Sequence, residues 1–123
     1  MPHSILIADD SPLIRQSLRR WLEFNHWQVC GEASDGLDAI EKAKELKPDL
    51  IVLDLSMPGM NGLEAARELK RINPSIPLLM FTSFNTPNVK CEAIAAGCGA
   101  VVSKSDPQQL LIESLQRLLK STS

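Results

Sequence analysis

The chain has 123 residues, which is close to the commonest length of one protein domain and too short for two ordinary hydrophobic cores. Hydrophobic residues make up 44% and charged residues 23%, which excludes a disordered chain, and 13 Lys and Arg against 15 Asp and Glu exclude a generally basic nucleic-acid binder. No apolar run approaches the roughly 18 residues of a membrane span, and the N-terminus lacks a secretory signal pattern. We therefore expect one cytoplasmic domain over 1–123, with a core of about 4–120. We expect this domain to contact neither membrane nor nucleic acid directly.

Short apolar runs alternate along the chain with stretches of helical periodicity. They predict strands over 4–8, 27–31, 50–53, 76–81 and 100–103, helices that begin at about residues 12, 36, 63, 87 and 107, and a loose tail over 120–123. Ser11-Pro12 and Asp106-Pro107 are typical helix starts. The first helix has an apolar face (Leu13, Ile14, Leu18, Trp21 and Leu22), and we expect Arg15 and Arg19 on its solvent side.

Strands that alternate with helices predict an α/β fold, in which a mostly parallel sheet is covered by helices on both faces. In such sheets, ligands bind beyond the carboxyl ends of the strands. Those ends are unusually polar here, and we expect the following side chains to meet at one edge of the sheet: Asp9 and Asp10 after the first strand, Asp54 after the third, Thr82 and Ser83 after the fourth, and Lys104 after the fifth.

Three carboxylates at one edge need compensation, because two like charges about 4 Å apart repel by roughly 4 kcal/mol at an effective dielectric constant near 20. Lys104 supplies one positive charge, and an oxygen-only ligand set suits Mg²⁺ or Mn²⁺ better than zinc. Asp54, alone after its strand, could then act as a nucleophile toward a phosphoryl group. Each residue by itself is more often a cap, a turn residue or a surface side chain, so the hypothesis depends on their coincidence.

Taken together, segments 5–10, 54–62, 81–83 and 103–104 resemble the receiver domain of two-component response regulators, and 100–105 resembles the receivers of NarL-type regulators. The resemblance implies a single CheY-like (flavodoxin-like) domain with strand order 2-1-3-4-5. It implies that Asp54 is the phosphoacceptor and that Mg²⁺, or Mn²⁺, is held by Asp9, Asp10, Asp54 and the backbone carbonyl of Ser56. Thr82 and Lys104 would contact the phosphoryl group.

The implied function is a phosphorylation-dependent signalling switch and not an enzyme, apart from its own phosphorylation and slow dephosphorylation. The donor would be a sensor histidine kinase or a histidine phosphotransfer protein. The output would pass through the fourth helix, fifth strand and fifth helix to a partner or attached domain. The sequence leaves open whether phosphorylation produces a homodimer and whether the chain stands alone or precedes a DNA-binding domain.

Three positions depart from the common family pattern. One is Ser56, two residues after Asp54, which either affects the lifetime of the phosphate or only faces solvent. Ser105 follows Lys104, where the family often has proline after a cis peptide bond, and Val101 stands where it often has an aromatic residue, so an aromatic switch there is impossible. Two alternative functions are a metal-dependent phosphatase or phosphotransferase with an Asp nucleophile, and a pseudo-receiver that only binds a partner. The cysteines, Cys30, Cys91 and Cys98, form no Cys-x-x-Cys pair, so we expect reduced, mostly buried thiols.

Overall fold

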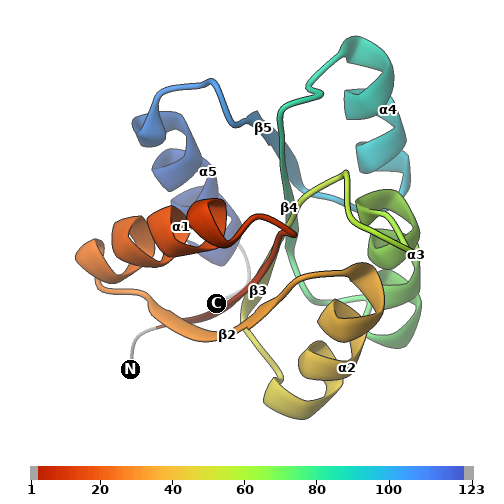
Figure 1. The fold of residues 1–123 in the computed structure, drawn as a ribbon, viewed down its shortest axis with the longest axis horizontal. Coiled ribbons are helices and arrows are strands. Elements are labelled where there is room, and N and C mark those ends of the chain that lie inside the picture. Colours follow the sequence, from red (N-terminus) through yellow and green to blue (C-terminus); the bar gives the residue numbers. More distant parts are fainter. Residues whose placement is uncertain (1–2, 121–123) are drawn as a thin grey trace.

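Five parallel strands form one sheet in the order β2-β1-β3-β4-β5, as Figure 1 shows for this computed structural model. The strands are β1 (Ser4–Ala8), β2 (Gln28–Ala33), β3 (Leu50–Leu53), β4 (Leu78–Thr82) and β5 (Ala100–Ser103). The helices are α1 (Pro12–Phe24), α2 (Gly36–Leu46), α3 (Gly62–Ile72), α4 (Pro87–Ala95) and α5 (Gln108–Lys120). The structure describes residues 3–120, so the predicted tail lies outside it except for Lys120, which ends α5. The predicted α/β fold and strand order are confirmed.

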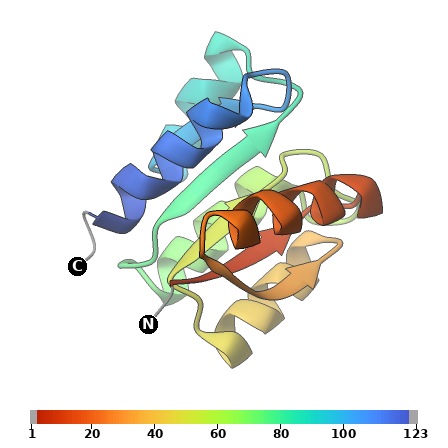
Figure 2. The ribbon, with the colours of Figure 1, turned by 90° about the vertical axis from the view of Figure 1, so that its left-hand side faces the viewer.

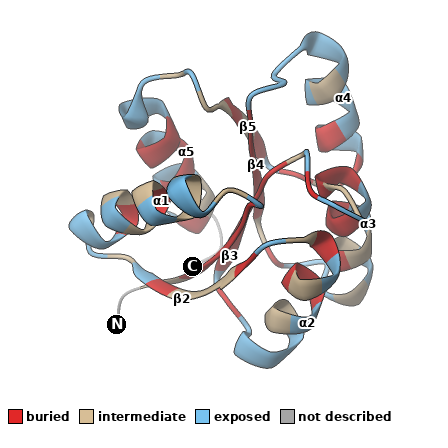
Figure 3. Ribbon diagram, viewed as in Figure 1, coloured by how far each residue is buried: buried red, intermediate tan, exposed pale blue. Residues whose placement is uncertain are grey.

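The sheet separates two apolar layers. Helices α1 and α5 cover one face, which Figure 2 turns toward the viewer, and α2, α3 and α4 cover the other. Alternate residues of a strand point to opposite faces, so Ile5 and Ile7 of β1 belong to the α1/α5 layer while Leu6 and Ala8 belong to the other. All four residues of β3 are buried, because helices cover a parallel sheet on both sides, and the strands run through the buried centre in Figure 3.

Three element boundaries differ from the sequence predictions. Strand β2 spans Gln28–Ala33 instead of 27–31, so it continues past Gly31 through Glu32. Strand β4 spans Leu78–Thr82 instead of 76–81, because Pro77, which has no N–H to donate, precedes it. Helix α5 begins at Gln108, after the predicted start at Pro107, because the Asp106 carboxylate accepts a hydrogen bond from the Ser103 amide and closes the preceding turn.

Side chains cap the starts of α1, α2 and α3 at the polar edge of the sheet, and the cap at Ser11 confirms the prediction for that position, whereas Asp106 accepts from the Ser103 amide instead of capping α5. Ser11 accepts a hydrogen bond from the Ile14 amide, and Asp35 accepts one from the Asp38 amide. Helix α3 starts with a capping box, in which Asn61 and Glu64 each accept a bond from the backbone of the other. In the described part of the chain, no helix is long and apolar enough to cross a membrane.

The first helix exposes more apolar surface and less charge than its pattern suggested. Leu13 is 74% exposed although it was assigned to the apolar face, whereas Leu18 and Leu22 are fully buried as predicted. Arg15, assigned to the solvent side, has only 19% of its side chain exposed and contacts β2 through Glu32. The side of α1 that faces β2 is therefore partly polar.

Candidate functional site

The carboxyl ends of β1, β3, β4 and β5 bring the predicted side chains to one edge of the sheet. Backbone hydrogen bonds continue beyond the strands and hold the next residues in line: the Asp9 amide donates to Ala33, the Asp54 amide to Ala8, and the Lys104 amide to Thr82, at 2.9–3.0 Å. Asp9 and Asp54 directly follow the buried strands β1 and β3. The sheet itself thus fixes the backbone of both acids.

Three carboxylates gather at this edge. One oxygen each of Asp9, Asp10 and Asp54 lie within 4.8 Å of one another. Asp9 is 1% exposed and Asp54 4% exposed, whereas Asp10 is exposed to solvent. The cluster therefore has a buried wall formed by two acids and an open side at Asp10.

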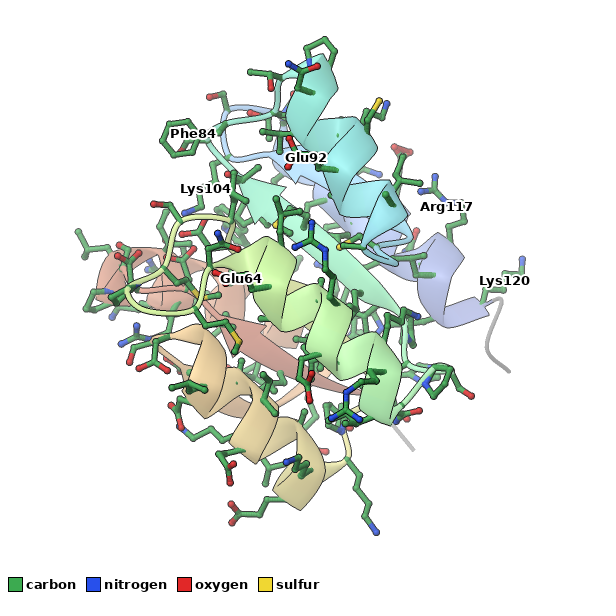
Figure 4. All side chains as sticks on the ribbon, turned by 90° about the vertical axis from the view of Figure 1, so that its right-hand side faces the viewer. Glu64, Phe84, Glu92, Lys104, Arg117 and Lys120 are labelled. Carbon is green, nitrogen blue, oxygen red and sulfur yellow. The ribbon has the colours of Figure 1, made fainter. Side chains whose placement is uncertain are left out.

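Lys104 is the cation that contacts this cluster. Its Nζ lies 2.8 Å from Oδ2 of Asp9 and 3.3 Å from Oδ2 of Asp54, and 15% of its side chain is exposed. Figure 4 labels Lys104, which lies at the end of β5 and near the start of α3, where Glu64 is also labelled. A single ammonium group faces three carboxylates, so negative charge remains uncompensated within the described residues.

The pKa values of Asp54 and Lys104, which contact each other, are both raised, for different reasons. Burial raises the pKa of Asp54, the charge of Asp9 raises it further, and Lys104 together with the Ser56 backbone opposes this. Burial alone would lower the pKa of Lys104, but its contacts with Asp9 and Asp54 outweigh burial and raise it. Lys104 therefore stays protonated, while the cluster resists holding all its negative charge.

Thr82 and Ser83 do not join the acidic cluster through any hydrogen bond of the described residues. Thr82 is fully buried at the end of β4, and its Oγ1 accepts a hydrogen bond of 3.1 Å from the Phe84 amide. Ser83 is exposed, and the Phe84 side chain is 55% exposed and points outward in Figure 4. The Thr82 hydroxyl thus has a backbone partner in the first turn after β4.

The loop between β3 and α3 passes very close to Asp54. The Gly62 amide donates to the carbonyl of Leu55 at 2.8 Å, and a Cβ atom at Gly62 would lie 2.2 Å from the carbonyl oxygen of Asp54. Ser56 lies in this loop and is exposed. The absence of a side chain at Gly62 is therefore what allows helix α3 to begin directly against the backbone of Asp54.

The remaining sequence questions at this edge are also answered by the geometry. The Lys104–Ser105 peptide bond is trans. Val101 is paired with Met80 of β4 and packs against the α2/α3/α4 layer, as ordinary strand packing predicts.

Cys98 is buried and Cys30 is partly buried, but Cys91 on α4 is exposed, so the prediction of mostly buried thiols is wrong for that residue.

Two residues next to the cluster were missed by the sequence analysis. Arg15 of α1 donates from its guanidinium group to the backbone carbonyl of Asp9 at 2.6 Å and from Nε to Glu32 at 3.0 Å. Glu32 also binds Arg19 at 2.8 Å. Glu32 was missed because β2 was predicted to end at Gly31; the alternation of the strand, continued by two residues, would have revealed it.

Chemically, the edge offers a cluster of carboxylate oxygens beside one ammonium group. Carboxylates without a nitrogen or sulfur ligand suit a hard divalent cation, and the uncompensated charge favours one. Asp54 follows the buried strand β3 and contacts Lys104, and burial raises its pKa. A carboxylate oxygen beside a cation and an ammonium group can accept a phosphoryl group.

Comparison with known proteins places these features in context. The sequence profile of the family described as "Response regulator receiver domain" matches residues 5–116. The chain is 33% identical over 120 residues to the chemotaxis protein CheY of Thermotoga maritima, covering 98% of this chain and 100% of that protein. It is 35% identical over 124 residues to the response regulator protein VraR of Staphylococcus saprophyticus, covering all of this chain but 59% of that protein.

The fold has equally close counterparts among solved structures. A two-component response regulator of the LuxR family from Aurantimonas sp. SI85-9A1 superposes with a TM-score of 0.94 at 30% identity, covering 98% of this chain and 87% of that one. These matches confirm the resemblance that segments 5–10, 54–62, 81–83 and 103–104 indicated. The likeness of 100–105 to NarL-type receivers agrees with the signal receiver domain of the putative response regulator NarL from Mycobacterium tuberculosis, which superposes with a TM-score of 0.91 at 27% identity, covering 97% of each chain.

Proposed function

Because the chain belongs to the response regulator receiver domain family, we propose that it is a phosphorylation switch whose phosphoacceptor is Asp54, with residues of about 4–120 as its folded core. Receiver domains are signalling modules of two-component systems and not classical enzymes. The observation that carries the assignment is that Asp54 shares a carboxylate cluster with Asp9 and Asp10 and lies 3.3 Å from Nζ of Lys104.

We assign the magnesium ligands to Asp9, Asp10, Asp54 and the backbone carbonyl of Ser56. The three carboxylates fit a hard cation, since their oxygens lie within 4.8 Å of one another and Lys104 is the one side-chain cation that the described residues place in contact with them. Bound Mg²⁺ supplies positive charge that the oxygens of a transferring phosphoryl group need. Mn²⁺ has the same ligand preference and would serve as a substitute.

In the transfer step, a carboxylate oxygen of Asp54 forms the new O–P bond while the P–N bond of a donor phosphohistidine breaks. The electron pair of the P–N bond goes to the imidazole nitrogen, which takes up a proton from water. Lys104 keeps its charge and holds the product through Asp54 or its phosphate. The donor is a sensor histidine kinase or a histidine phosphotransfer protein.

The switch begins at Thr82. Its hydroxyl currently accepts from the Phe84 amide, and a phosphoryl group on Asp54 offers three acceptor oxygens in exchange. Turning the hydroxyl toward the phosphoryl group releases the Phe84 amide and pulls on the connection between β4 and α4. Lys104 acts in the same way at the end of β5. We infer that the surface of α4, β5 and α5 then changes and controls a partner, an attached output domain or a second copy of the chain.

The test is mass spectrometry after incubation with acetyl phosphate and Mg²⁺. We expect one added phosphoryl group, located at Asp54, and none in Asp54→Asn. Asp10→Asn should need a higher Mg²⁺ concentration for the same labelling. Steady turnover of the phosphate donor without a stoichiometric label would instead favour a phosphatase or phosphotransferase. Mg²⁺ binding without any label on Asp54 would favour a pseudo-receiver.

A further inference from the structure

Arg15 is joined to the acidic cluster by the main chain and not by a side chain of that cluster. Its guanidinium group spans two acceptors, the Asp9 carbonyl at 2.6 Å and the Glu32 carboxylate at 3.0 Å. We propose that Arg15 is a positioning residue of the magnesium site, which holds the Asp9–Asp10 backbone so that both carboxylates face the ion. This inference rests on the function proposed above, since it concerns the same site.

The contact from Arg15 completes the fixation of Asp9. The amide of Asp9 donates to Ala33, its Oδ1 accepts from the Ser11 amide at 2.9 Å, and its Oδ2 contacts Lys104. The remaining polar atom of the residue, the carbonyl oxygen, is the one that Arg15 binds. Every polar atom of Asp9 therefore has a partner, so the residue has one orientation.

Asp10 has no such anchors. Its side chain is exposed and accepts no hydrogen bond from the described residues. The direction of its carboxylate is set by its own backbone, and the peptide group that Arg15 holds is the one that joins Asp9 to Asp10. Without that contact, the Asp9–Asp10 peptide can rotate, and the oxygen of Asp10 leaves the group of atoms that lie within 4.8 Å.

Glu32 holds the guanidinium group of Arg15 in place. Its two oxygens are shared between Arg15 and Arg19, and its backbone carbonyl accepts a hydrogen bond from the Lys42 ammonium group. A planar guanidinium group bound to a fixed carboxylate points its remaining N–H groups in fixed directions. One of those directions is the Asp9 carbonyl.

Arg19 provides a matched control for the charge of Arg15. Both residues are on α1, both bind Glu32, and replacement of either by alanine removes one positive charge near the site. Only Arg15 contacts Asp9. Loss of a positive charge by itself strengthens the binding of a cation, whereas loss of the backbone contact weakens it, so the two effects have opposite signs.

Isothermal titration of the full chain with MgCl₂ tests the proposal without depending on phosphorylation. We expect the Kd for Mg²⁺ to rise about tenfold in Arg15→Ala, as is usual when a residue that orients a metal ligand is removed. Arg19→Ala should leave it unchanged or slightly lower. Arg15→Lys, which can reach one acceptor but not both in the same geometry, should fall between Arg15→Ala and the wild type.

Equal Kd values in Arg15→Ala and Arg19→Ala would overturn the proposal, and so would a lower Kd in both. Urea unfolding of each variant shows whether it is folded, and Arg15→Lys keeps the comparison available if Arg15→Ala is not. Failure of the wild type to bind Mg²⁺ would overturn both this proposal and the metal assignment. Wild-type binding without labelling of Asp54 would overturn the phosphoacceptor assignment alone.

Discussion

At the scale of single residues, Lys104 and the proposed magnesium ion depend on the same oxygens. The ammonium group lies against Oδ2 of Asp9 and Oδ2 of Asp54, and both acids are also members of the carboxylate cluster. Two cations that neutralise the same carboxylates compete for them. The contact that stabilises the free protein thus weakens its hold on a metal.

We therefore expect Lys104→Ala to bind Mg²⁺ more tightly than the wild type while being less stable in metal-free buffer. The loss should be about 2 kcal/mol of unfolding free energy, since two buried carboxylates lose their cation, and added Mg²⁺ should restore most of it. Urea unfolding with and without MgCl₂ measures both effects. Lys90→Ala, which removes an exposed lysine of α4, is the control, and weaker Mg²⁺ binding in Lys104→Ala would contradict the competition.

At the scale of elements, the connection from β3 to α3 determines where Asp54 lies. Helix α3 begins at Gly62, where an added Cβ would be 2.2 Å from the Asp54 carbonyl oxygen. Gly59 in the same loop is different, because its φ of +73° is a conformation that favours glycine but nothing lies within 4 Å of an added Cβ. Substitution of Gly62 therefore tests close packing against Asp54, whereas substitution of Gly59 tests backbone conformation alone.

Gly62→Ala should lose at least about 2 kcal/mol of unfolding free energy and label more slowly at Asp54, because the clash is with backbone that cannot turn aside. Gly59→Ala should lose about 1 kcal/mol, the cost of a left-handed conformation, and label at the wild-type rate. Chemical denaturation and time-resolved mass spectrometry with acetyl phosphate give the two numbers. Equal labelling rates in both variants would mean that the approach of α3 does not set the position of Asp54.

At the scale of the whole molecule, stability in acid should depend on the ion pairs that join α1 to β2. Burial would raise the pKa of Glu32, but its bonds to Arg19 and Arg15 outweigh burial and lower it below the usual 4.5. A carboxylate whose pKa is lower in the folded than in the unfolded state stabilises the fold above its unfolded pKa. That contribution is lost as the pH falls through the folded value.

The difference in unfolding free energy between the wild type and Glu32→Gln should thus be constant from pH 7 to about pH 5, at about 1 kcal/mol, and should vanish as the pH falls further. Urea unfolding over pH 3–7 measures it. Glu45→Gln, which removes the charge of an exposed glutamate of α2, is the control. A Glu32→Gln difference that does not decrease below pH 5 would show that the contribution of Glu32 is not ionic.

The sequence was sufficient for the fold and for the acids and lysine of the site, for a physical reason. Apolar runs that alternate with amphipathic stretches predict a parallel sheet covered by helices, and the residues that follow its strands must lie at one edge. Asp9, Asp54 and Lys104 could be placed together because each directly follows a strand of that sheet.

Of the two residues that were missed, Arg15 reaches the site through the backbone. It donates to the carbonyl oxygen of Asp9, and such a partner is present at every residue and leaves no signature in the sequence. Glu32 was missed because Gly31 and Glu32 interrupt an apolar run although the pairing with β1 continues. In the sequence, Arg15 looks like a solvent-facing residue of α1. Its inward role becomes visible only when Glu32 is known to lie on the neighbouring strand β2.

The division of the interior by the sheet has a consequence for motion. Neighbouring residues of β1 fill different layers, so a strand that slid past its neighbour would leave voids above and below the sheet at the same moment. That double penalty makes the strands a stiff frame. If the proposed phosphoryl group on Asp54 displaces this edge of the sheet, the movement falls on a segment with little buried packing, and the run from Ser83 to Asn88 is exposed throughout.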